Sequence, residues 1–281
     1  MNSRFERPES VAGAARLLAT GPWAVLAGGT DLYPAHVGRP IALPLLDLSD
    51  IASLRGIHDD ARGWTIGATT TWTDVIRADL PPLFDALKAA AREIGGVQIQ
   101  NAGTVAGNLC NASPAADGTP VLLALGASVV LASQRGEREL AVEDFVLGSR
   151  RTARWADELV VAVRVPARSA RCRSAFIKLG GRRYLTISMT MVAVVIDRDE
   201  AGRVAHAGVA VGSCSAVAKR LPQLEAKLVA ASPGSDLAGL VDPTDLAPLA
   251  PLDDLRASAT YRLDASATLL RRALRSLEPR S

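Results

Sequence analysis

Two glycine-rich segments, far apart in the chain, constrain its fold more than any other feature. The first turn is residues 27–32 (Ala-Gly-Gly-Thr-Asp-Leu), and the second turn lies within residues 101–108 (Asn-Ala-Gly-Thr-Val-Ala-Gly-Asn). Glycine tolerates positive φ and leaves space beside the backbone. If the fold brings the two turns together, their main-chain N–H groups can hold a phosphate-bearing ligand. Taken singly, the first is also compatible with an ordinary strand-ending turn, and the second with a polar loop that caps a helix.

Composition narrows the class of protein. The chain has 281 residues, of which 48% are apolar and 22% charged, and its formal charge is only +3. These values are typical of a protein with a large core. Binding to nucleic acid requires clustered basic residues interleaved with aromatic ones, and the sequence has no such run. The most apolar stretch, 121–132, is too short to span a membrane.

The cysteines and the N-terminus predict a cytoplasmic protein. Cys110, Cys172 and Cys214 lie far apart and form no C-x-x-C pair, so neither a disulfide framework nor a metal cluster held by this chain is expected. The first residues include no apolar signal-peptide core. Cys110 lies inside the second glycine-rich segment, where a packing role is favoured over a nucleophilic one because no histidine is near in sequence.

The first 168 residues predict an α+β domain with two lobes. A capped helix from residue 10, strands at 24–27 and 43–48, and the first turn form a small α/β lobe, about 1–53. The larger lobe, about 54–168, is expected to contain strands at 64–68, 97–100, 128–132 and 159–165, with helices at 83–94 and 120–125. In this interpretation both glycine-rich turns follow strands.

A boundary is expected after residue 168, because a polar segment follows Pro166. Beyond it, strands at 174–179, 189–197 and 204–212 predict a three-stranded antiparallel sheet, and the helical patterns at 221–231 and 263–277 predict helices that back it. The second domain is therefore 169–281. Residues 232–251, rich in proline, alanine, glycine and aspartate, are expected to be irregular.

Several polar side chains are candidates for ligand contacts. Thr104 and Asn108 carry donors and acceptors within the second turn, and Asp117 can accept from hydroxyl or ring N–H groups. Lys178 is expected at the end of a strand, where it can approach an anion or simply face solvent. The common dinucleotide and triphosphate fingerprints are absent from the sequence, and the histidines show no metal-ligand spacing.

These segments together resemble a known family, the FAD-binding medium subunit of molybdenum hydroxylases. The group includes the medium subunit of carbon monoxide dehydrogenase and the FAD domain of xanthine dehydrogenase. The resemblance lies in residues 25–32, 94–108 and 111–117, in 157–160 before Pro166, in Lys178 with Arg183 and 187–188, and in 253–262. It implies a two-lobed FAD-binding domain of the PCMH type, with FAD in the groove between the lobes.

The resemblance also implies which residues contact FAD. The two turns would hold the diphosphate and ribityl region, Leu159 would pack on the ring system and Lys178 would lie near the flavin. The full set is Leu26, Ala27, Gly28, Gly29, Thr30, Asp31, Leu32, Thr104, Ala106, Gly107, Asn108, Asp117, Leu159 and Lys178. No residue of this chain is expected to act as a catalytic acid or base, and no metal ligand is expected.

The function implied is that of an oxidoreductase subunit that transfers electrons. An iron–sulfur small subunit would supply them, a molybdenum-cofactor large subunit would oxidise the organic substrate, and oxygen, a quinone or NAD would be the external acceptor. Two alternatives stay open: a self-sufficient flavin oxidase or dehydrogenase, and a scaffold subunit that has lost FAD. The sequence departs from the family pattern at two positions. Residue 106 is alanine where glycine is usual, and residue 100 is glutamine where arginine is common.

Overall fold

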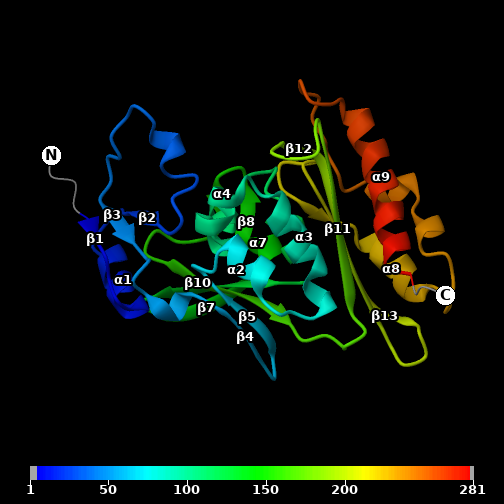
Figure 1. The fold of residues 1–281 in the computed structure, drawn as a ribbon, viewed down its shortest axis with the longest axis horizontal. Coiled ribbons are helices and arrows are strands. Elements are labelled where there is room, and N and C mark those ends of the chain that lie inside the picture. The colour runs from blue at the N-terminus through cyan, green and yellow to red at the C-terminus, as the bar shows by residue number, and fades with distance from the viewer. Residues whose placement is uncertain (1–4, 279–281) are drawn as a thin grey trace.

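The computed structural model describes residues 5–278, which form three parts side by side along the long axis (Figure 1). The first part has parallel strands in the order β1 (Phe5–Glu6), β3 (Leu45–Asp47), β2 (Ala24–Leu26). Helix α1 (Val11–Leu18) precedes β2, and the Ser10 side chain caps it by accepting from Gly13 N–H at 3.1 Å. The small α/β lobe is thus present, with β1 as a third strand that was not predicted.

The central part is built on an antiparallel five-stranded sheet. Its order is β4 (Ile57–Asp60), β5 (Gly63–Gly67), β10 (Leu159–Pro166), β6 (Ser128–Ser133), β7 (Gly136–Ala141). The remaining elements are α2 (Trp72–Arg77), α3 (Asp85–Glu93), α4 (Val97–Ala102), α5 (Val105–Asn111), α6 (Gly118–Ala124), α7 (Val142–Phe145), β8 (Val146–Gly148) and β9 (Arg151–Thr152). The strand predicted at 159–165 is therefore the middle strand of this sheet.

The third part is an antiparallel sheet of β11 (Arg173–Gly180), β12 (Ser188–Arg198), β13 (Val204–Gly212) and the short β14 (Lys219–Arg220). Helices α8 (Pro222–Ala230) and α9 (Ala259–Ser276) cover one face. The three predicted strands and both helices are confirmed, and two-residue β14 is added at the edge. Between the helices, the stretch predicted as irregular contains only the short 3-10 helices Ala238–Leu240 and Pro243–Leu246.

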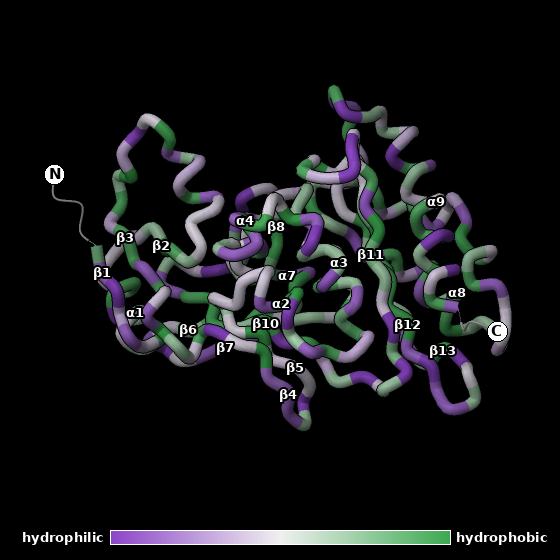
Figure 2. Tube along the Cα trace, in the orientation of Figure 1, coloured by the Kyte–Doolittle hydropathy of each residue, from purple (hydrophilic) through white to green (hydrophobic). Residues whose placement is uncertain are grey.

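Both faces of the third sheet are buried. On β12, Ala193 and Val195 belong to the core that continues into the central part, whereas Val192 and Val194 belong to the core beneath α8 and α9. Alternate side chains of a strand point to opposite faces, so this strand serves two cores at once. Figure 2 shows hydrophobic residues along β11, which runs between α3 and α9. The third sheet is consequently packed against α3 and α6 as well as against its own helices.

One secondary-structure prediction was wrong. Residues 97–100 were expected to form a strand, but they lie in helix α4. Their alternating valine, glutamine, isoleucine and glutamine sequence is too short to decide between periods of 2 and 3.6. Gly95 has a positive φ of 57° and ends the preceding helical segment, which lets a new helix start at once. The second turn therefore lies between two helices and does not follow a strand.

Within residues 5–278, every helix is too short or too polar to cross a membrane. Location in the cytoplasm stays a prediction, as does the division of the chain at residue 168.

Candidate functional site

The first turn leaves its backbone open. It directly follows β2, and within the described part of the chain the N–H groups of residues 28–32 have no hydrogen-bond partner. Gly29 has φ of +67°, a conformation that L side chains rarely adopt. Five successive unpaired N–H groups at the edge of a cleft form a concave donor surface of the kind that binds anions.

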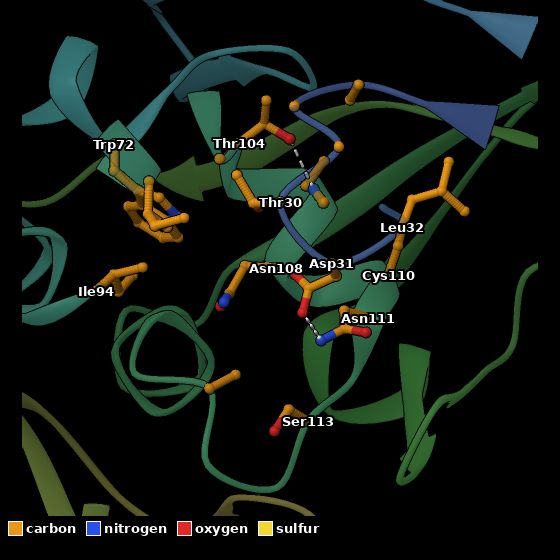
Figure 3. Close-up of a pocket in the computed structure, with 18 of the residues that line it drawn as sticks. Thr30, Asp31, Leu32, Trp72, Ile94, Thr104, Asn108, Cys110, Asn111 and Ser113 are labelled. Atoms are coloured by element: carbon orange, nitrogen blue, oxygen red, sulfur yellow. Dashed lines mark hydrogen bonds between the residues drawn. The ribbon is translucent and has the colours of Figure 1, made fainter. Parts of the chain in front are cut away.

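The two glycine-rich turns meet. A Cβ atom on Gly28 would lie 1.8 Å from the Ala102 carbonyl oxygen, so only glycine allows this approach of the two backbones. A Cβ on Gly103 would lie 3.3 Å from Thr30 Oγ1. A side-chain hydrogen bond also ties the first turn to the end of α5: Asn111 Nδ2 donates to Asp31 Oδ1 at 2.9 Å (Figure 3). The convergence on which the ligand hypothesis depends is therefore present.

The second turn is the capped start of α5. Thr104 Oγ1 accepts from Gly107 N–H at 3.0 Å, and Val105 N–H donates to the Thr70 carbonyl at 3.0 Å (Figure 3). Asn108 N–H donates to the Thr104 carbonyl. Three of the N–H groups expected to face a ligand are thus used within the protein. The turn offers the ligand side chains and a rigid wall more than backbone donors.

The side-chain oxygen of Asn108, Oδ1, is buried without a hydrogen-bond partner among the described residues. Buried polar atoms are nearly always paired, so an unpaired one in a cleft indicates a ligand. Gly118 stands beside it: a Cβ there would lie 2.6 Å from the Trp72 ring and 2.9 Å from Asn108 Oδ1. The missing side chain therefore lets the Trp72 ring and Asn108 pack closely against the start of α6.

The C-terminal sheet supplies another wall of the cleft. Lys178 on β11 donates from Nζ to Asp117 Oδ2 at 2.7 Å, and the side chains are each only 7% exposed. Ser188, at the start of β12, donates to the other oxygen, Asp117 Oδ1, at 2.9 Å. Burial raises the pKa of Asp117, and the contacts with Lys178 and Ser188 act in the opposite direction. Lys178, for which the sequence left open a ligand contact or a solvent-facing position, is therefore half of a buried ion pair at the cleft wall.

Leu159 begins β10, and the residues before it are held tightly. The Glu158 carboxylate, 2% exposed, accepts from Arg138 Nε at 2.5 Å, from Arg138 Nη2 at 2.7 Å and from Trp155 N–H at 2.8 Å. Burial opposes ionisation, but these donors dominate and lower the pKa of Glu158. The loop before Leu159 consequently presents a fixed surface to the cleft.

One cleft of about 920 Å³ contains all of the predicted contact residues in its lining. Clefts that hold organic ligands are typically roughly 300–1,000 Å³, so this one has room for a large cofactor. Sequence reasoning missed several other lining residues, namely Trp72, Ile94, Gly95, Asn111, Ser113, Arg150, Arg154 and Arg256. Ile94, Gly95, Asn111, Ser113 and Arg256 lie in segments that carry the family resemblance, whereas Arg150 and Arg154 carry no signal that separates them from surface residues.

The two departures from the family pattern are accommodated. Ala106 lies inside α5 with ordinary helical backbone and packs into the core at 4% exposure. The backbone at Ala106 is helical, so alanine fits there without strain. The replacement of glycine by alanine therefore gives no support to the alternative of a scaffold subunit that has lost FAD. Gln100 Nε2 donates to the Arg92 carbonyl at 3.1 Å, which ties α4 to α3.

The described residues contain no cluster of three or more histidine, cysteine, aspartate or glutamate side chains suited to a metal. Cys110, Cys172 and Cys214 are free thiols.

Comparison with known proteins assigns the class. The model for the FAD binding domain in molybdopterin dehydrogenase matches residues 1–168, and the model for the CO dehydrogenase flavoprotein C-terminal domain matches residues 175–277. The chain belongs to this family of FAD-binding oxidoreductase subunits.

Individual relatives match three quarters or more of the chain. The carbon monoxide dehydrogenase medium chain of Afipia carboxidovorans is 32% identical over 99% of this chain and 97% of that protein. The nicotinate dehydrogenase FAD-subunit of Eubacterium barkeri is 34% identical over 75% of this chain and 73% of its own. A solved carbon monoxide dehydrogenase of Hydrogenophaga pseudoflava matches with a TM-score of 0.85 and 30% identity, covering 98% and 96% of the two chains. FAD is therefore the cofactor of this subunit.

Proposed function

We propose that this chain holds FAD non-covalently in the cleft between its two turns and carries electrons from the iron–sulfur clusters of a partner subunit to an external acceptor. The observation that carries the proposal is the convergence of an open N–H surface and an unpaired, buried Asn108 Oδ1 on one cleft. A diphosphate matches the first feature and a polar hydrogen of the cofactor matches the second.

The lining residues would have different roles. Backbone N–H groups of residues 28–32 would hold the diphosphate, since each hydrogen bond to a charged acceptor is worth roughly 1.5–3 kcal/mol. Asn108 and Asp117 would accept from polar hydrogens of the cofactor. Leu159, at 3% exposure, offers an apolar surface for a ring, and Lys178 offers a cation beside it. Ala27 and Leu32 complete the wall around the first turn.

FAD, when bound, supplies the capacity to take up electrons singly and to release them in pairs. The protein contributes position and charge. Lys178 and Asp117 form a pair with no net charge at the cleft wall, and Glu158 is already neutralised by Arg138. No proton transfer by a side chain is required of this subunit.

The partners follow from what this chain lacks and from its relatives' names. Its three thiols are scattered and each is free, so the iron–sulfur clusters and the molybdenum cofactor would be carried by a small and a large subunit. The names "medium chain" and "FAD-subunit" describe members of assemblies in the relatives. Oxygen, a quinone or NAD would be the acceptor, and the assembly would work in the cytoplasm.

We also propose that the chain divides into an FAD-binding domain, 1–168, with lobes of about 1–53 and 54–168, and a C-terminal domain, 169–281. The extents of the two family models support this division.

An absorption spectrum of the purified chain tests the cofactor assignment, and FAD released by heat identifies it. The electron-transfer role is tested in the assembled complex, by following flavin absorbance after addition of a reductant to the iron–sulfur subunit. Flavin bleaching that requires the partner subunit supports the proposal. A colourless chain that takes up no added FAD overturns it, and turnover of an organic substrate by the isolated yellow chain favours the self-sufficient oxidase.

A further inference from the structure

We infer that Ser188, on the C-terminal sheet, is a positioning residue for the FAD site: its hydroxyl fixes the Asp117 carboxylate in the orientation that meets the cofactor. The inference rests on the proposed function, because it concerns how that site is held in shape. Ser188 does not itself line the cleft, whereas Asp117 and Lys178 do.

The Asp117 carboxylate receives one donor on each oxygen. Ser188 donates to Oδ1 at 2.9 Å and Lys178 donates to Oδ2 at 2.7 Å. Ser188 is 2% exposed and Asp117 6% exposed, so water cannot readily replace either donor. A carboxylate offers about four lone-pair directions, which leaves acceptor capacity on both oxygens for a ligand. With both oxygens held, the carboxylate plane cannot rotate freely.

The two donors come from neighbouring strands, and the carboxylate comes from another part of the chain. Asp117 directly precedes α6, while Lys178 and Ser188 are on β11 and β12. Lys178 Nζ also approaches the Glu93 carbonyl oxygen at 3.5 Å, at the end of α3. The contacts therefore tie the cleft wall to the C-terminal sheet.

The whole segment leading to Asp117 is held in the same manner. Arg150 N–H donates to the Ala112 carbonyl at 3.1 Å, at the start of the segment. Ser213 N–H, just after β13, donates to the Pro114 carbonyl at 3.1 Å, at its middle. Residues 113–117 line the cleft between α5 and α6. The contacts at Pro114 and Asp117 come from the C-terminal part of the molecule.

The sheet that carries these anchors is itself rigidly seated. A Cβ on Gly208 of β13 would lie 2.0 Å from the Ala124 carbonyl oxygen, so the sheet and α6 touch backbone to backbone. Because protein interiors are close-packed, this contact fixes the position of the sheet relative to α6. Ser188 is thus held where its hydroxyl reaches Asp117, before any ligand binds, and this arrangement lowers the entropy cost of binding.

The test compares FAD affinity of full-length variants after removal of bound flavin, measured by quenching of flavin fluorescence. Ser188→Ala is expected to weaken FAD binding roughly three- to tenfold, because the carboxylate loses one of its two fixed donors. Ser188→Thr, which retains the hydroxyl, is expected to restore most of the affinity. Thr190→Val is the matched control, since Thr190 is a fully buried hydroxyl two residues along β12 that contacts Ser266 instead.

A double-mutant comparison separates positioning from general loosening of the fold. Asp117→Asn alone is expected to weaken FAD binding, and Ser188→Ala is expected to add little further loss in that background. Additive losses, or equal losses in Ser188→Ala and Thr190→Val, would overturn the inference. So would an unchanged affinity in Ser188→Ala. Failure of the wild-type chain to bind FAD is a separate outcome, which refutes the proposed function itself.

Discussion

The two glycine-rich turns look alike in sequence and differ in structure. The first is partly exposed, follows a strand and keeps the N–H groups of residues 28–32 free of partners within the described chain. The second is largely buried, joins two helices and uses the N–H groups of Val105, Gly107 and Asn108 internally. Glycine content alone therefore does not make an anion site; unpaired donors do.

This difference assigns separate tasks to the turns. The first provides the donor surface for a diphosphate, and the second provides a stable wall against which the first is pressed. Gly28 serves both, because its lack of a side chain allows contact with Ala102 and shapes the donor surface. The comparison makes distinct predictions. Displacing the donor surface of the first turn should weaken binding most, whereas in the second turn loss of the Thr104 cap should lower stability and loss of the unpaired Asn108 oxygen should weaken binding alone.

The largest effect is expected at the contact between the turns. In Gly28→Ala the new methyl group would meet the Ala102 carbonyl oxygen, so the first turn must move away from the second. Overpacking of this kind costs about 1–3 kcal/mol, and FAD affinity should fall roughly 100-fold because the donor surface is displaced. FAD titration of the flavin-free chain measures the loss. Gly148→Ala is the control, because its nearest neighbour would be 3.9 Å away. Equal affinities in the two variants would contradict the task assigned to the first turn.

The next effect concerns the unpaired amide. Asn108→Leu preserves side-chain size but removes the buried Oδ1, so FAD affinity should fall roughly tenfold or more while the flavin-free chain keeps its melting temperature. Asn101→Leu is the matched control, because the Asn101 oxygen already accepts from Thr73 at 2.6 Å outside the cleft. An Asn108→Leu chain that binds FAD like the wild type would show that this atom has another partner.

Thr104 distinguishes a helix cap from a ligand contact. Thr104→Ala removes the acceptor for Gly107 N–H and should lower the free energy of unfolding of the flavin-free chain by about 1 kcal/mol. Thr104→Ser should retain nearly all of it. Chemical denaturation without FAD measures the difference. A variant with unchanged stability but a large loss of FAD affinity would reverse the task given to the second turn.

Much of the fold was predictable, because burial left a clear period in the sequence. Strands 159–165 and 204–212 are rich in apolar residues, and the long helix at the C-terminus has an amphipathic pattern. All three were found close to their predicted bounds. The helix at residues 97–100 was not predicted, because four residues fit a strand period of 2 as well as a helix period of 3.6. The positive φ of Gly95 ends the preceding helical segment and allows a new helix to begin there. β1 is two residues long and carries no pattern at all.

The site was predictable in its residues and less so in its connections. Every residue that the family resemblance implies as an FAD contact lines one cleft. The Asp117–Lys178 pair joins residues 61 apart in sequence, and Ser188 joins it from the next strand. Such contacts depend on how the C-terminal sheet packs against the start of α6, which no local sequence pattern records.

The smallest effect is expected outside both turns, in the loop whose Arg256 lines the cleft. Asp254 in that loop accepts from the Arg256 N–H at 2.8 Å and from Arg262 Nη2 at 2.7 Å, and these contacts lower its pKa from 3.8 to about 2. A depressed pKa in the folded state adds stability above pH 3.8, and this stability is lost as the pH falls toward 2. Asp254→Asn should therefore show a shallower loss of unfolding free energy than the wild type between these pH values, whereas Asp264→Asn, on the exposed face of α9, should follow the wild type. Parallel curves for Asp254→Asn and the wild type would place the acid sensitivity elsewhere in the chain.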